Sequence, residues 1–295
     1  MSHESNSSGS RIRYWTWWMP VFAMLWAAAL FYFAKEPVAL FESHWYFIIV
    51  GFCAAVIGNI SALGGGIVFI PVMIFLFHLP PVAALKIAIA SQCFGMTSGA
   101  VAWIEKKIVP LQALVYTVPG LLIGSTISSL LIHPNALLVK LLFGPVSIVL
   151  GVTTLILASR AHGTGIREVP KHAMVPVFIA SLVGGMLTGW VAIGEGEVVA
   201  ALLMLFYGMD IAACIGLGCV LLAINSIYLT FIHQFALGGI PWDIAAFTVL
   251  GTVFGARFSP WIAHRLPHVA LKKVFAFIAI GDGILFITQY ILMNH

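Results

Sequence analysis

The amino-acid sequence predicts an all-α protein that crosses a membrane several times. Of its 295 residues, 61% are hydrophobic and only 8% are charged, and its mean hydropathy is +1.07. A soluble domain carries about 25% charged residues, so this chain has too few of them to cover a water-facing surface. The apolar residues also fall into successive long runs. Within lipid, a helix satisfies every backbone hydrogen bond inside one such run.

This composition excludes several classes of function. A soluble enzyme, a nucleic-acid-binding protein and a disordered scaffold all need more charge than this chain has. The net charge of +4 does not imply an acidic partner, because Lys and Arg in a membrane protein act mainly by setting its orientation. The four cysteines lie inside apolar runs without metal-ligand spacing. We therefore expect them to pack as small apolar residues, and we expect neither a metal site nor a cofactor.

The chain begins with a polar, Ser-rich stretch, and we expect residues 1–13 to be disordered. The apolar run 14–34 follows two arginines and is long enough to cross about 30 Å of hydrocarbon. Trp17 and Trp18, near its start, suit a membrane interface. We interpret this run as a retained extra transmembrane helix rather than a signal peptide.

The other apolar runs are separated by Pro- and Gly-containing turns. Their approximate bounds are 45–63, 67–77, 81–104, 110–132, 136–158, 173–193, 197–207, 211–235, 241–263 and 269–293. One sizeable hydrophilic loop, 159–172, lies near the middle of the chain. This loop is therefore a predicted linker between two halves.

The two halves resemble each other. A shift of 130 residues places Gly64-Gly65-Gly66 on Gly194-Glu195-Gly196, and Asn59 on Gly189. With one or two residues of slippage, Gly120, Gly124, Ser128, His133, Lys140 and Gly151 fall on Gly251, Gly255, Ser259, His264, Lys272 and Gly283. Chance matches of Gly are common in membrane sequences, but His and Lys matching in the same order are harder to dismiss. We therefore predict an internal repeat, over 45–158 and 173–293.

The placement of positive charge predicts how the halves are arranged. Suppose that 45–63 with 67–77, and 173–193 with 197–207, are hairpins that return to their starting side. With a cytoplasmic N-terminus, the inside then holds Arg11, Arg13, Lys106, Lys107, Arg160, Arg167, Lys171, Arg265, Lys272 and Lys273. This satisfies the positive-inside rule, whereas two single crossings would move the linker outside.

We therefore predict two inverted repeats, each a Gly-broken helical hairpin plus three transmembrane helices. The linker 159–172 is then cytoplasmic. The protein is expected to be a multi-pass protein of the plasma (inner) membrane. Pairs of full crossings stay open as the alternative to the hairpins.

Both halves interrupt an apolar segment at equivalent glycines, Gly64-Gly65-Gly66 and Gly194-Glu195-Gly196. Each glycine costs a helix about 1 kcal/mol relative to Ala, and unwinding frees backbone groups that must find partners. Paired breaks of this kind point to a transporter's binding site. Helices starting at Ile67 and Val198 would direct N–H groups at the breaks, which suits an anion. Close helix packing through small residues is the alternative.

Glu195 and Glu197 lie at the second break. An ionised carboxylate at membrane depth costs a few kcal/mol and usually has a function. Two carboxylates two residues apart repel each other when both are ionised, so we interpret the pair as candidates for coupling transport to protons. For Glu197, capping of the following helix is an equally good interpretation.

Further polar side chains lie at predicted membrane depth. The predicted substrate-binding set is Asn59, Gly64, Gly65, Gly66, Ser91, Gln92, Gly194, Gly196 and Asn225. Interhelical hydrogen bonding is the alternative role for the polar members. Lys86 and Arg257 are cations well inside apolar runs and can attract an anion, although such side chains ordinarily extend to an interface.

The residues of both breaks resemble a known family. Ala62–Pro71 (ALGGGIVFIP) and Gly189–Ala200 (GWVAIGEGEVVA) are similar to the Gly-rich signature of the sulfite exporter TauE/SafE family, also described as the 4-toluene sulfonate uptake permease family. The resemblance covers about residues 45–293. Two departures are Ala62 and Glu195, which stand where glycine is usual. An anion would bind beside Glu195 only if that acid were protonated or paired.

The resemblance implies secondary transport of a small sulfur-containing anion, such as sulfite, sulfoacetate or another organosulfonate. We expect alternating access coupled to a proton or ion gradient. Export is slightly favoured, and uptake of aromatic or alkyl sulfonates is the alternative. A homodimer is kept open.

Two other classes of function fit less well. An intramembrane enzyme needs a catalytic set at membrane depth, and the sequence has no HExxH or GxSxG motif. We therefore predict no catalytic residue. A channel is expected to show rings from an oligomer rather than an inverted repeat. The chain also has no Walker A motif, which argues against an ATP-driven pump.

Overall fold

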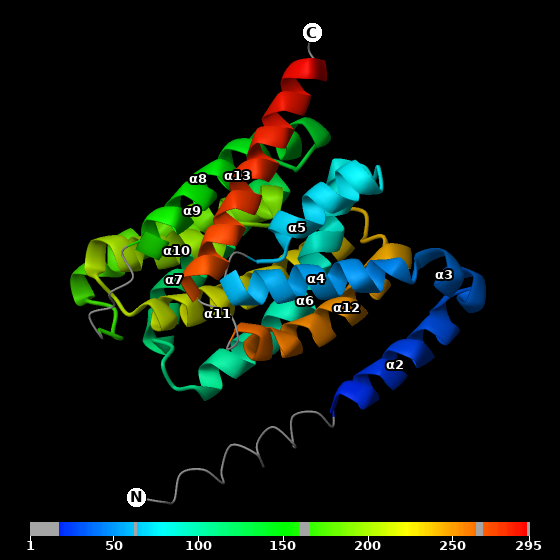
Figure 1. Cartoon of the computed structure of the whole chain (residues 1–295), viewed down its shortest axis with the longest axis horizontal. Coiled ribbons are helices and arrows are strands. Elements are labelled where there is room, and N and C mark those ends of the chain that lie inside the picture. Colours follow the sequence, from blue (N-terminus) through cyan, green and yellow to red (C-terminus); the bar gives the residue numbers. More distant parts are fainter. Residues whose placement is uncertain (1–17, 62–63, 160–165, 264–267, 294–295) are drawn as a thin grey trace, which may run out of the picture. The chain divides into compact units, whose positions relative to one another are not determined.

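A computed structural model describes residues 18–61, 64–159, 166–263 and 268–293. Helices make up almost all of these residues, and the only β pairing among them is a single bridge between Ile166 and Met209 (Figure 1). The predicted all-α class is therefore confirmed. The chain divides into two compact units with a boundary after Tyr46.

The first unit contains α2 (Trp18–Phe33) and α3 (Pro37–His44), which meet at an angle of 120°. Pro37 begins α3 at a position where the missing N–H of proline costs nothing. The sequence predicts one helix over 14–34, and α3 was not predicted. The stretch 1–13 lies outside the described residues.

The second unit begins with a Gly-broken helix pair and three longer helical segments. They are α4 (Tyr46–Ser61), α5 (Gly66–Pro71), the π-helix η1 (Val72–Leu76), α6 (Pro81–Glu105), η2 (Leu111–Ala113), α7 (Leu114–Thr126), the π-helix η3 (Ile127–Leu131) and α8 (Ala136–Ser159). The same order follows again as η4 (Lys171–Ala173), α9 (Met174–Val191), α10 (Glu195–Tyr207), α11 (Ile211–Phe235), α12 (Trp242–Ala263) and α13 (His268–Met293).

Each broken segment is a hairpin in the structure. In the first, the rings of Phe47 and Phe77 lie 4.6 Å apart between centroids, so η1 ends beside the start of α4. In the second, the rings of His172 and Tyr207 are 5.5 Å apart. Each broken segment therefore returns to the side from which it started.

The helices α6 and α11 run antiparallel, and so do α8 and α13. Along α6 and α11, Lys86 contacts Gly239 while Gln92, farther along α6, contacts the earlier residue Ser226. The pair α8 and α13 lies side by side in Figure 1. Here a Cβ on Gly283 would lie 2.6 Å from the carbonyl oxygen of Gly144. Farther along α8, a Cβ on Gly151 would lie 2.9 Å from the carbonyl oxygen of Ala276, which comes earlier in α13.

Two further helix pairs cross between the halves through glycines. On α7 and α9, a Cβ on Gly120 would lie 2.6 Å from the carbonyl oxygen of Phe178. On α12 and α4, a Cβ on Gly251 would lie 2.7 Å from the amide nitrogen of Phe52. Gly120 and Gly251 are paired in the predicted sequence repeat, and both make a close backbone contact of this kind.

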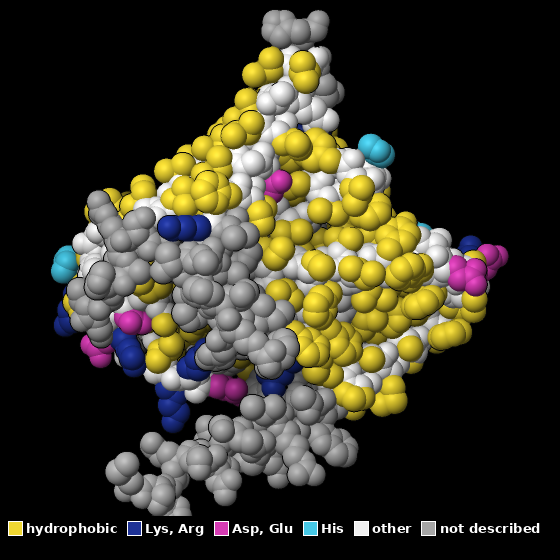
Figure 2. Space-filling view, viewed as in Figure 1, with side chains coloured by type: hydrophobic (Ala, Val, Ile, Leu, Met, Phe, Trp, Pro, Cys, Tyr) yellow, Lys and Arg dark blue, Asp and Glu magenta, His cyan; other side chains and the backbone are white. Residues whose placement is uncertain are grey.

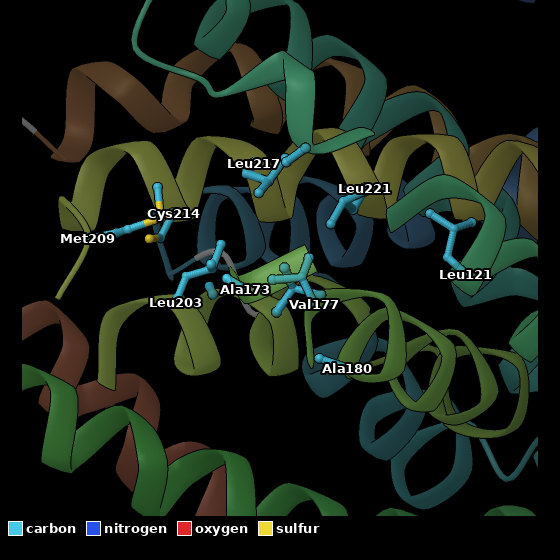
Figure 3. Packing of buried hydrophobic residues seen from close by; sticks show 12 residues of the cluster. Leu121, Ala173, Val177, Ala180, Leu203, Met209, Cys214, Leu217 and Leu221 are labelled. Carbon is cyan, nitrogen blue, oxygen red and sulfur yellow. The ribbon is translucent and has the colours of Figure 1, made fainter. Parts of the chain in front are cut away.

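Apolar side chains fill the interior and cover the outside. Figure 3 shows Val177, Leu203, Leu217 and Leu221 packed between α9, α10 and α11. Hydrophobic side chains also cover much of the surface visible in Figure 2, and Leu131 is 73% exposed. Among the described residues, five helices are long and apolar enough to cross a membrane, or six if the bent α2–α3 pair counts as one span. This pattern is typical of a multi-pass membrane protein.

Candidate functional site

The two breaks have strained backbone conformations and begin short helices. Gly64 has φ +68° in the first break, and Ala192 and Gly194 have φ +56° and +125° in the second. Glycine tolerates these angles, whereas Ala192 is strained. The following helices start at Gly66 and Glu195, one and three residues earlier than the sequence predicts. Both glutamates therefore lie in the first turn of α10.

The two breaks contact each other directly. A Cβ added to Gly66 would lie 2.9 Å from the carbonyl carbon of Ala192, closer still to its oxygen, and 2.9 Å from Cγ2 of Ile193. Ordinary contacts of a Cβ are 3.4–4 Å. The structure thus joins the halves where Gly66 meets Ala192, a place that we call the junction.

Gln92 of α6 is bound at the junction and is only 2% exposed. Its Nε2 donates a hydrogen bond of 2.7 Å to the carbonyl oxygen of Ala192, and its Oε1 accepts one of 3.3 Å from Ser226 of α11. The same Nε2 lies 3.4 Å from where Gly64 would carry a Cβ. Gln92 therefore contacts both breaks and satisfies a carbonyl group that unwinding has freed.

The backbone amides that open the second break are bound within the protein. Glu197 Oε2 accepts a hydrogen bond of 3.0 Å from the amide of Gly194, and Thr188 Oγ1 accepts one of 3.0 Å from the amide of Glu195. The expectation that N–H groups at this break face an anion does not hold for these two. Glu197 acts as a cap through Oε2, while its buried Oε1 has no hydrogen-bond partner in the described residues.

Glu195 is fully buried where α7, α9, α10 and α11 meet. Its Oε1 lies 2.6 Å from Ser181 Oγ, and its Oε2 has no hydrogen-bond partner in the part of the chain that is described. A Cβ on Gly184 would lie 2.7 Å from the Cα of Glu195, and one on Gly196 would lie 2.8 Å from the carbonyl oxygen of Gly218. Glycines on α9 and α11 thus let the start of α10 approach closely.

Asn225 neighbours Ser226 but faces α7. Its Oδ1 lies 2.5 Å from Ser125 Oγ, and its Nδ2 is buried without a hydrogen-bond partner in the described residues. One turn along, Tyr228 and Thr126 are joined by a hydrogen bond of 2.7 Å. Asn225 is therefore next to Ser226 in the sequence, but its Oδ1 is bound to α7.

Four of the predicted site residues have their hydrogen-bond or charge partners away from the junction. Ser91 is hydrogen-bonded to Thr248 of α12 at 2.7 Å, and Asn59 Nδ2 donates to the carbonyl oxygen of Ala55. Lys86 donates to the carbonyl oxygens of Leu237 and Gly239 at the end of α11. Arg257 is close enough to Glu105 for their charges to interact. Lys86 and Arg257 are partly buried, and each has a partner within the protein.

The hydroxyl groups that bind the second break, those of Ser181 and Thr188, were not among the predicted site residues. Ser181, Gly184, Gly185, Thr188 and Gly189 recur at helical spacing and are all buried on α9. This stripe of small and hydroxyl residues could have predicted the face of α9 that packs against α10. Among the described residues, no three His, Cys, Asp or Glu side chains are grouped so as to hold a metal ion.

Comparison with known proteins extends these observations. The chain is 24% identical over 261 residues to the probable membrane transporter protein YunE of Bacillus subtilis (strain 168), and the alignment covers 80% of this chain and 94% of YunE. No solved structure matches the chain. The sequence pattern of the sulfite exporter TauE/SafE family matches residues 47–285, which include both breaks. The chain therefore belongs to the sulfite exporter TauE/SafE family of membrane transporters.

Proposed function

We propose that this protein is a secondary transporter that moves a small sulfur-containing anion, such as sulfite, sulfoacetate or another organosulfonate, by alternating access at the junction. The observation that carries the proposal is the contact of Gly66 with Ala192, whose carbonyl oxygen also accepts a hydrogen bond from Gln92. Broken helices that meet between two halves of a transporter commonly form its substrate site. The direction is export in the preferred form of the proposal and uptake in the alternative.

The arrangement of helices supports two inverted repeats around that site. Inverted repeats place equivalent helices in opposite directions, as α6 runs against α11 and α8 against α13. The two hairpins are then re-entrant, and the linker 159–172 lies in the cytoplasm with the N-terminus. Lys106, Lys107 and Lys171 also fall on that side, in agreement with the positive-inside rule. The membrane is the plasma (inner) membrane.

The chemistry at the junction favours recognition of an anion by neutral donors. Gln92 and Ser226 supply amide and hydroxyl groups at the junction, whereas Lys86 and Arg257 are bound elsewhere. The neighbouring residue on α11, Asn225, has a buried Nδ2 without a hydrogen-bond partner in the described residues. Sulfite and sulfonate oxygens accept several hydrogen bonds at once, which fits such donors. Glu195 and Glu197 at the second break are the candidates for coupling anion movement to protons.

The test is transport by the purified protein in proteoliposomes. Sulfite, sulfate, thiosulfate, taurine, sulfoacetate and aromatic sulfonates are each offered, and uptake of the labelled anion is measured. We expect flux of at least one sulfur-containing anion, lost in Gln92→Ala because the Ala192 carbonyl loses its donor. Thr97→Ala on the same helix is the matched control, since the hydroxyl group of Thr97 donates to the carbonyl oxygen of Cys93 within its own helix.

Two results would contradict the proposal. If the wild-type protein moves none of these anions, the assignment of substrate class is wrong. If Gln92→Ala transports as well as Thr97→Ala does, the junction is not the substrate site.

A further inference from the structure

The hydroxyl group of Ser181 lies between two oxygens that both accept hydrogen bonds. Ser181 Oγ lies 2.6 Å from Glu195 Oε1 and 2.8 Å from the carbonyl oxygen of Thr117 on α7. Both are hydrogen-bond distances between oxygens. A serine hydroxyl carries one hydrogen, a backbone carbonyl carries none, and an ionised carboxylate carries none. A single hydrogen cannot make two linear hydrogen bonds of these lengths, so two such bonds need a second hydrogen.

The position of that hydrogen follows from the chemistry of the three groups. If Ser181 donates to Thr117, Glu195 must donate to Ser181, and only a protonated carboxyl group can do so. If Ser181 donates to the carboxylate instead, two oxygens 2.8 Å apart face each other with no hydrogen between them. A neutral Glu195 satisfies both contacts, and an ionised one satisfies only one.

Ser125 also lies between two oxygens, but there the second hydrogen has another source. Ser125 Oγ also lies near two oxygens, Asn225 Oδ1 at 2.5 Å and the carbonyl oxygen of Gly185 at 3.2 Å. A side-chain amide brings its own hydrogens and can turn them toward the serine. A carboxyl group has a hydrogen only after it binds a proton.

The surroundings of Glu195 also disfavour a charge on it. The side chain is fully buried, and Oε2 has no hydrogen-bond partner in the described residues. A buried carboxylate without a cation or several donors is costly. The charge that acts on Glu195 is that of Glu197, which has the same sign.

The helices around Glu195 carry few other ionisable groups. The described segment Met174–Val191 of α9 has none, and α11 carries the buried thiols of Cys214 and Cys219 together with Tyr228 and the buried His233. On α10 itself, the ionisable residue besides the two glutamates is Tyr207. On α7 the ionisable residue is Tyr116, and on α8 it is Lys140, in the second turn. The charged group that acts on Glu195 remains Glu197.

Glu197 has a different task, because its Oε2 accepts the amide hydrogen of Gly194. An acceptor needs no proton of its own. The two neighbouring glutamates therefore play different parts, one as a cap and the other as a donor.

We propose that Glu195 is the proton-binding site of this transporter and is a neutral carboxylic acid in the conformation described here. Ser181 is a positioning residue that links the acid to Thr117, so the proton is held where α7, α9 and α10 meet. When α10 separates from α7 and α9, the carboxyl O–H bond breaks, its electron pair stays on the carboxylate and water accepts the proton. The claim that this proton drives anion transport rests on the proposed function. Of the two glutamates considered there for proton coupling, Glu195 is the one that binds the proton.

Infrared spectroscopy of the full chain in lipid tests the protonation state without any substrate. We expect a C=O stretching band of a protonated carboxyl group that is lost in Glu195→Gln and retained in Glu197→Gln. Ser181→Ala should shift the frequency of the band, because the acid loses its acceptor. A spectrum that Glu195→Gln leaves unchanged would overturn the inference.

Proton movement in proteoliposomes tests the coupling, with sulfoacetate as the probe anion and a pH-sensitive dye inside. We expect sulfoacetate entry to change the internal pH in the wild type and in Asp282→Asn, which alters a half-buried acid on α13 outside the site. Glu195→Gln should lose the pH change but still exchange labelled for unlabelled sulfoacetate, since its amide can donate to Ser181 as the acid does. Persistent proton movement in Glu195→Gln would refute the coupling role. Absence of any anion flux in the wild type would instead contradict the proposed function, and the infrared result would stand by itself.

Discussion

The contact between the two breaks can be tested by adding one methyl group. In Gly66→Ala the new Cβ lies 2.9 Å from the carbonyl carbon of Ala192, whereas ordinary contacts begin at 3.4 Å. The backbones of the two breaks must therefore separate by at least about 0.5 Å. The carbonyl carbon and oxygen of Ala192 both belong to the backbone, so a change of side-chain conformation cannot relieve their overlap with the new Cβ.

The magnitude follows from the cost of overpacking. Extra methyl groups in a well-packed interior typically cost about 1–3 kcal/mol of stability. The matched control is Gly281→Ala on α13, where an added Cβ meets nothing within 4 Å and helix propensity favours Ala by about 1 kcal/mol. The two variants should therefore differ by about 2–4 kcal/mol. Gly65→Ala should fall between them, because its Cβ meets the ring of Phe69 at 3.0 Å and that side chain can move.

The assay is unfolding of each purified variant in detergent, followed by circular dichroism, together with anion flux in proteoliposomes. We expect the order of stability Gly281→Ala, then Gly65→Ala, then Gly66→Ala, with flux lowest in the last. If Gly66→Ala matches Gly281→Ala in both measurements, the two breaks do not meet as described.

Three further predictions concern other contacts. Gln92→Leu should lower the free energy of unfolding by about 1–3 kcal/mol relative to Thr97→Ala, because the Ala192 carbonyl is left unsatisfied; equal stability in denaturant titrations would contradict this. Lys86→Met should speed hydrogen exchange at the end of α11, since the carbonyl oxygens of Leu237 and Gly239 lose their donor, while unchanged protection there would show that Lys86 does not hold that end. Gly124→Ala and Gly255→Ala should each lower the free energy of unfolding by about 1–3 kcal/mol. The new Cβ would lie 2.9 Å from the carbonyl carbon of Leu182 in the first variant and 3.0 Å from that of Phe52 in the second. A large effect in one half and none in the other, measured by thermal unfolding, would contradict the repeated packing.

Local properties of the chain account for the helices that were predicted correctly. The runs 81–104 and 211–235 correspond to α6 (Pro81–Glu105) and α11 (Ile211–Phe235), because hydropathy and flanking turn residues determine where such helices begin and end. The helix α3 was missed because Pro37–His44 is short and contains Glu42. The π-helical turns η1 and η3 were missed as well, since hydropathy does not report the hydrogen-bonding pattern of a helix.

The residues at which α5 and α10 begin depend on contacts that the local sequence does not contain. Gly64-Gly65-Gly66 and Gly194-Glu195-Gly196 predicted the positions of both breaks, since glycine weakens a helix wherever it occurs. The first turn of α10 begins three residues early because Glu197 and Thr188 bind the amides of Gly194 and Glu195. Thr188 lies on the preceding helix, so its contribution depends on how the hairpin closes.

The sequence by itself determined that this is a helical membrane protein with two glycine breaks in equivalent places. Lipid permits few backbone structures, and apolar composition, charge placement and glycine runs are readable along the chain. Only the tertiary structure decided which predicted residues meet. It brought Gln92 to Ala192, one hundred positions away, and it placed Ser91, Lys86 and Arg257 in other contacts. It also set Ser181 between Glu195 and Thr117. Such contacts depend on how whole helices pack, because a hydrogen bond between distant residues requires distances and angles that no local pattern contains.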